Sequence, residues 1–189
     1  MTMKHTEEIK KINEQISQRF NRIEAGINAT RDIPALFETL FSGIQKEFDI
    51  PFVWVALIDR QDTASMIAAV EASETLKNRF CVLSAESFGS IIPDVTKPVL
   101  ANRNLQPCYR LLPPARKYFI KSLAMVPFEL QGRIAGVWNC ADPSAERFTP
   151  EMETDLLAAF GRALSRRLTE LAAGSLQADL IPKEDVRDD

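Results

Sequence analysis

The sequence contains a single histidine, His5, which lies outside every apolar segment. This scarcity excludes Ser-His-Asp and Cys-His schemes of nucleophilic catalysis, and also a histidine-rich metal or haem site. Carboxylates remain as candidate acids or bases, but they fall at expected turns, where acids serve solubility and turn geometry. These turn carboxylates are Asp59, Asp62, Asp94 and Asp142. We therefore expect no catalytic centre, no haem and no metal.

Cysteine is also scarce, because only Cys81, Cys108 and Cys140 occur and no two form a Cys-x-x-Cys pair. An odd number of separated cysteines argues against a disulfide framework and favours reduced thiols. Cys81 and Cys140 stand in apolar segments, where cysteine is usually a small buried residue. Cys108 stands beside Tyr109 and Arg110, and nearby cations could lower the pKa of its thiol. Inert thiols are the leading interpretation, and redox sensing through Cys108 is the alternative.

Long apolar runs and an excess of basic charge are both missing. No stretch of about 18 apolar residues occurs, and residues 1–8 lack the apolar core of a signal peptide. The formal net charge is −3, which the five acids and two bases of residues 174–189 account for entirely. Residues 1–173 are thus formally neutral, unlike a general nucleic-acid binder. We expect a cytoplasmic protein that neither spans a membrane nor binds nucleic acid directly.

The first element that the sequence predicts is an amphipathic helix over about residues 4–28. Ile9, Ile16 and Ile23 recur every seven residues, which places them on one face of a helix. Charged residues occupy the other faces, so the apolar stripe needs a partner. We interpret the stripe as a homodimer interface, and packing on the chain's own domain is the alternative. The expected interface residues are Ile9, Ile12, Ile16, Phe20, Ile23 and Ile27.

A second helix is predicted from Asp32, a typical amino-terminal cap, to Phe48. Pro34 is tolerated there because the first turn loses no intrahelical N–H bond. The continuous apolar run 52–58 then predicts a strand buried on both faces. Shorter elements follow, and we expect strands over residues 65–70, 79–83 and 98–100 and a short helix over residues 86–93.

The strongest strand signal lies late in the chain. Apolar segments over 120–130 and 133–140 flank a Gln-Gly dipeptide, which is short enough to turn an antiparallel hairpin. Residues 149–151 then supply a hydroxyl cap, a proline and an acid, which together predict the start of the last helix. That helix should reach about Ala173 and stop at the glycine that opens an acidic, disordered tail over 174–189.

Three segments near the carboxyl end carry a family resemblance. Phe119–Phe128 has a basic residue, a serine and a Val-Pro-apolar ending, and it resembles the penultimate strand of GAF domains. Gly132–Trp138 resembles the strand that follows. Residues 142–152 are similar to the Asp-Pro, Arg-Phe and Pro-x-Met signature of the GAF-like branch known as domain of unknown function 484.

The resemblance implies an α/β (α+β) fold with a GAF/PAS-like central antiparallel sheet. It implies helices packed on one face of that sheet, and helical arms at the amino and carboxyl ends. We therefore divide the chain into a dimerisation helix over 1–28, a GAF-like domain with its carboxy-terminal helix over 29–173, and the tail over 174–189.

The segment between Arg103 and Lys121 is the candidate ligand lid. It carries five basic residues, no acidic residue and both tyrosines of the chain, and its prolines oppose a long helix or central strand. If it covers the sheet as in ligand-binding GAF domains, it attracts a small anionic or aromatic ligand. A solvated loop is the alternative. The candidate binding residues are Trp54, Cys108, Tyr109, Arg110, Tyr118, Lys121, Met125 and Trp138, although core packing is the safer interpretation of the two tryptophans.

The resemblance names a scaffold and not a reaction, because one fold houses many functions. The Asn-Lys-x-Asn-Phe pattern of cyclic-nucleotide GAF domains is missing, as is a cysteine in a bilin-attachment context. We expect a non-catalytic regulatory or sensor domain that acts as a homodimer and binds a small molecule or a signalling protein. The alternatives are a ligand-free dimerisation or adaptor module, a cysteine-based redox sensor, and an enzyme resembling methionine-sulfoxide reductases.

Overall fold

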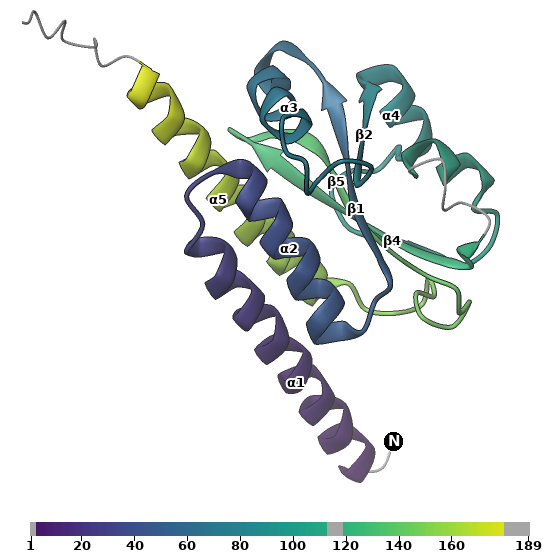
Figure 1. Ribbon diagram of the computed structural model, residues 1–189. Helices are drawn as coiled ribbons and strands as arrows, with labels where there is room; N and C mark the ends of the chain where they lie inside the picture. Colours follow the sequence, from purple (N-terminus) through teal and green to yellow (C-terminus); the bar gives the residue numbers. More distant parts are fainter. Residues whose placement is uncertain (1–2, 113–118, 180–189) are drawn as a thin grey trace, which may run out of the picture.

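A computed structural model of the chain describes residues 3–112 and 119–179 (Figure 1). Five strands form one sheet in the order β2-β1-β5-β4-β3. Their bounds are β1 (Phe52–Asp59), β2 (Phe80–Ser84), β3 (Val99–Ala101), β4 (Ser122–Leu130) and β5 (Arg133–Asp142). The β1–β2 pairing is parallel and the other three are antiparallel. This sheet and its helices confirm the expected α/β fold class. The expected antiparallel sheet with helices on one face is corrected, because β1 and β2 run parallel and α4 and η2 pack on the second face.

The β4–β5 hairpin forms where the sequence predicts it. Gln131 and Gly132 connect the strands with φ angles of 53° and 76°. A positive φ at both central residues is what a two-residue type I′ turn requires, and glycine adopts it without steric cost. The Gln131 N–H also donates to the Thr169 hydroxyl at 3.0 Å, which ties the turn to the last helix.

Three long helices gather on one face of the sheet (Figure 1). They are α1 (Met3–Asn28), α2 (Ile33–Phe48) and α5 (Asp155–Asp179). The predicted cap of α2 is confirmed, because the Asp32 carboxylate accepts the Ala35 N–H at 2.8 Å. Shorter helical elements complete the fold, namely η1 (Gln61–Thr63), α3 (Ala64–Glu71), α4 (Ala85–Ile91) and η2 (Gln106–Leu111).

The core has two parts, one on each side of the sheet. Val55 and Leu57 of β1 face the long helices, whereas Trp54 and Ala56 face α4 and η2. All four side chains are buried, so successive residues of β1 alternate between two apolar layers. The prediction of a strand buried on both faces is confirmed.

The predicted strand over residues 65–70 is wrong, because this segment is helix α3. Its buried residues are Met66, Ile67 and Val70, whose spacing of one and then three residues fits one face of a helix. A short apolar run does not distinguish a buried strand from a buried helix by periodicity alone.

Both predicted ends of the last helix are wrong. The Met152 N–H donates to the Thr149 carbonyl and closes a separate turn, and α5 begins at Asp155, with the Ala158 N–H donating to the Thr154 carbonyl at 2.8 Å. At the other end, α5 continues through Gly174, because one glycine costs only about 1 kcal/mol in a helix. The expected tail therefore does not begin at residue 174, and residues 180–189 lie outside the described part of the chain.

Candidate functional site

The predicted ligand-binding residues divide between the two faces of the sheet. Trp138 lies among the long helices, whereas Trp54, Cys108 and Met125 lie in the apolar cluster on the opposite face. There η2 packs directly on the sheet, and the Trp54 indole N–H donates to the Leu111 carbonyl at 2.6 Å. The structure therefore does not gather these residues around one space.

The polar members of the predicted site face outward. Arg110 is exposed and donates to the Ser87 hydroxyl at 3.0 Å, and Lys121 is exposed as well. Tyr109 is half-buried against the apolar cluster beneath η2. Tyr118 lies outside the described residues. The cavities described below are lined by none of Cys108, Tyr109 or Arg110.

All three cysteines are free, and burial raises the pKa of each thiol. The pKa of Cys81 rises to about 12, and its Sγ lies 3.0 Å from the Leu111 carbonyl. For Cys108 this direction is opposite to the one expected from its basic neighbours, because Arg110 turns to Ser87 and desolvation decides the shift. Thiolates are the nucleophiles in redox chemistry, so raised pKa values disfavour a cysteine-based site.

We expect the thiols of the folded protein to react slowly with Ellman's reagent at about pH 8, near the ordinary thiol pKa. Burial both hides the sulfur atoms and keeps them protonated. The same protein in denaturant should release the full colour of three thiols at once. Rapid reaction of one thiol in the folded state, located by mass spectrometry at Cys108, would contradict this assignment.

A cavity of about 480 Å³, here called the helix-side cavity, opens between α1, the end of α2, the sheet and the segment that leads into α5. Its walls are mainly apolar and aromatic, and four charged side chains stand around it. The aromatic residues are Phe20, Phe48, Trp138 and Phe148, and the charged residues are Arg19, Arg147, Glu153 and Asp155. Of these residues the sequence predicted only Trp138 as ligand-binding and Phe20 as an interface residue, and it missed the others, although Arg147-Phe148 stood in the family signature.

Two polar groups of this cavity have hydrogen-bonding capacity left over. Arg147 is half-buried and donates from Nη2 to the Phe48 carbonyl, and it has no ion-pair partner among the described residues. The indole N–H of Trp138 is fully buried and has no hydrogen-bond partner in the same part of the chain. An unsatisfied buried donor costs about 1 to 3 kcal/mol, whereas the free donors of Arg147 are available to an acceptor in the cavity.

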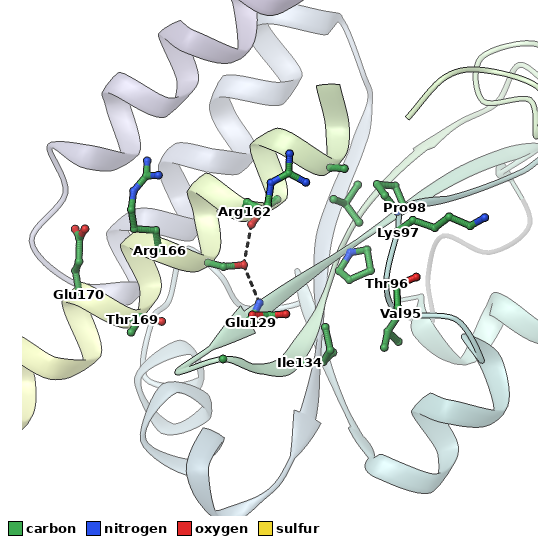
Figure 2. A pocket seen from close by; sticks show the side chains of 16 residues that line it. Val95, Thr96, Lys97, Pro98, Glu129, Ile134, Arg162, Arg166, Thr169 and Glu170 are labelled. Carbon is green, nitrogen blue, oxygen red and sulfur yellow. Dashed lines mark hydrogen bonds between the residues drawn. The ribbon is translucent and has the colours of Figure 1, made fainter. Parts of the chain in front are cut away.

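A groove of about 590 Å³ lies between α5 and residues 95–98, beside residues 126–130 of β4, which extend beyond the pairing with β3 (Figure 2). Polar groups at its floor already have hydrogen-bond partners. The Ser165 hydroxyl accepts the Glu129 N–H at 2.8 Å and donates to the Gly161 carbonyl at 2.8 Å. Pro127 adds an edge position without an N–H, which is typical of a protected strand edge. In Figure 2 the Lys97 side chain points away from α5. We therefore interpret this region as one that protects the edge of β4 from pairing with a strand of another chain.

The six predicted interface residues of α1 have two different environments. Phe20, Ile23 and Ile27 are buried in the chain's own core, so that part of the dimer prediction is corrected. The Phe20 ring lies 4.7 Å from the Phe48 ring and 5.0 Å from the Phe160 ring, centroid to centroid. By contrast, Ile9 is 42% exposed and Ile12 is 55% exposed. Ile16 lies half-buried between the two groups.

In Figure 1 the amino-terminal end of α1 extends beyond the end of α2. Within residues 3–112 and 119–179, no group of three or more His, Cys, Asp or Glu side chains is placed to hold a metal ion. In the same part of the chain, no helix combines the length and apolar character needed to cross a membrane.

Comparison of the sequence with models of protein families and with curated proteins finds no match. The structure is similar to the crystal structure of the GAF domain from an Acinetobacter phosphoenolpyruvate-protein phosphotransferase, with a TM-score of 0.50 and 13% sequence identity. The match covers 89% of this chain and 98% of that chain. The fold is therefore GAF-like. The finer resemblance to domain of unknown function 484 stays a prediction.

Proposed function

We propose that this chain is a non-catalytic regulatory domain that acts as a homodimer through the amino-terminal half of α1. The observation that carries the proposal is the exposure of Ile9 and Ile12 on the same stripe whose later members are buried. Large apolar side chains that continue a buried stripe into solvent are typical of a protein interaction surface. The GAF-like fold supports a regulatory role, because such domains bind ligands or partners in signalling proteins.

The chemistry of α1 favours a second copy of this chain as the occupant. The seven-residue spacing of Ile9, Ile16 and Ile23 is the repeat of helices that pair along their length. The exposed turns carry both charge signs, with Glu7 and Lys10 among them, so two copies can place opposite charges together. A closed two-fold pairing would then cover both exposed isoleucines at once.

The buried half of α1 connects the proposed dimer contact to the rest of the domain. An ion pair of 2.9 Å joins Arg166 of α5 to Glu24, and just after α1 the Thr30 carbonyl accepts a hydrogen bond from Arg167 of α5 at 2.5 Å. Arg22 also pairs with Glu47 of α2 at 2.6 Å. The buried half of α1 is thus fixed to both other long helices. A change in how α1 docks would change the geometry between the two copies.

The test is a double substitution, Ile9→Glu with Ile12→Glu. We expect the wild-type protein to have about twice the 21.2 kDa mass of one chain by light scattering after gel filtration, and the variant to have the mass of one chain. Buried glutamates would be desolvated without partners in the interface, which disfavours association strongly. Truncation of the whole helix is unsuitable, because it removes Phe20, Ile23 and Ile27 from the core.

Lys11→Glu is the matched control, since it changes the formal charge of α1 by the same amount at an exposed position off the stripe. This variant should keep the dimeric mass. A monomeric wild-type protein, or a double variant that stays dimeric with an unchanged dissociation constant, would overturn the proposed interface.

A further inference from the structure

We propose that the helix-side cavity binds a small molecule with a flat apolar or aromatic body and one carboxylate or similar anionic group. This inference deepens the proposed regulatory function. Ligand binding itself does not depend on the proposed dimer, whereas the effect of the ligand on the dimer helix α1 does. The cavity lies on the face of the long helices, opposite η2, which belongs to the basic segment that the sequence indicates.

Aromatic side chains from four different segments define the apolar part of the site. Phe20 comes from α1, Phe48 from the end of α2, Trp138 from β5 and Phe148 from the segment before α5. A volume of about 480 Å³ falls in the range of about 300 to 1,000 Å³ that is typical of small-molecule sites. The ring of Phe160 packs edge-on against Trp138 at 5.8 Å and supports the floor from behind.

Arg147 supplies the charge that selects an anion. Its guanidinium carries five N–H donors, and the Phe48 carbonyl accepts one of them. Arg147 also opposes the rise in the pKa of buried Cys140, so its positive charge acts at the cavity wall. Capping the end of α2 explains one donor of this arginine. It leaves the remaining donors for an acceptor in the cavity.

The acids at the rim do not reverse this selection. Glu153 and Asp155 are exposed, where water and salt screen their charges, whereas Arg147 is half-buried. Arg19, whose guanidinium lies 5.8 Å from the centroid of the Phe48 ring, is also exposed, so its charge is screened in the same way as those of the acids. The less screened charge at the site is therefore positive.

The position of the cavity couples a ligand to the dimer helix. Ile16, Arg19 and Phe20 line it from α1, at the point where the exposed half of the stripe becomes buried. A ligand that touches these residues binds the docked arrangement of α1 better than an undocked one, which shifts the population toward docking. Amide exchange of α1 should then slow when the ligand is present.

The probe for the test is 2-naphthoate, and its neutral counterpart is 2-naphthylmethanol, both titrated into the full chain by calorimetry. We expect one 2-naphthoate per chain and binding about tenfold tighter than that of the alcohol, because only the anion can form an ion pair with Arg147. Arg147→Gln should weaken 2-naphthoate binding by about tenfold and leave the alcohol unaffected. Arg133→Gln is the matched control, because Arg133 pairs with Asp62 and does not line this cavity.

Ile16→Trp provides a second variant, which fills the cavity from the half-buried position on α1. It should abolish binding of both probes, and thermal unfolding verifies that each variant is folded. Absence of 2-naphthoate binding to the wild type, equal binding of anion and alcohol, or unchanged binding by Ile16→Trp would overturn the proposal. Light scattering on the same samples reports the dimer independently, so failure of the site and failure of the interface are distinguishable.

Discussion

Replacement of Gly136 by alanine is expected to lower the free energy of unfolding by about 3 kcal/mol or more. Gly136 lies in β5, between β1 and β4. A Cβ atom added there would lie 2.2 Å from the Ala56 carbonyl oxygen and 3.1 Å from the end of the Phe128 ring. The oxygen belongs to the backbone of β1, which pairs with strands on both sides and cannot retreat without breaking ladder hydrogen bonds.

Urea denaturation followed by circular dichroism measures this effect, with Gly89→Ala as the matched control. Gly89 lies within α4, and a Cβ atom added there meets nothing within 4 Å. Alanine is favoured over glycine in a helix by up to about 1 kcal/mol, so the control should be neutral or stabilising. If Gly136→Ala unfolds at the same urea concentration as the wild type, the register of β1 against β5 is wrong.

Sequence patterns predicted the elements whose signals are local. The cap at Asp32 and the turn at Gln131-Gly132 each depend on a few adjacent residues, and both are present. The close approach at Gly136 was not predictable in the same way, because it depends on which β1 residue lies opposite. The predicted start of α5 was wrong for a related reason. Thr149 and Thr154 each supply a hydroxyl residue at which a helix could begin, and the local sequence does not decide between them.

The candidate site was harder to predict than the fold, because a site depends on which side chains meet in space. The basic residues near Arg110 are close in sequence, yet the structure directs Arg110 toward Ser87 and packs Cys108 onto the sheet. The helix-side cavity instead joins residues as distant as Phe20 and Arg147. The apolar stripe on α1 was evident in the sequence. Its pattern does not show, however, whether the stripe packs on the chain's own core or on a second copy.

Phe20→Ala tests this division of α1, and we expect it to lower the free energy of unfolding by about 3 to 5 kcal/mol. Phe20 is only 9% exposed and packs against the rings of Phe48 and Phe160, so its removal leaves a void at the junction of all three long helices. Ile12→Ala is the control on the same stripe. Because Ile12 is 55% exposed, its loss should change the stability of one chain by about 0.5 kcal/mol or less.

Both variants require urea denaturation at protein concentrations low enough to keep the chain monomeric, since binding of a second copy adds to apparent stability by mass action. Repeating the measurement at high concentration should then destabilise Ile12→Ala relative to the wild type, whereas the cost of Phe20→Ala should be large at both concentrations. Equal and small effects of the two substitutions would mean that α1 is not docked on α2 and α5 in solution. In that case the helix-side cavity would lose one wall, and the link between the ligand and the dimer would fail with it.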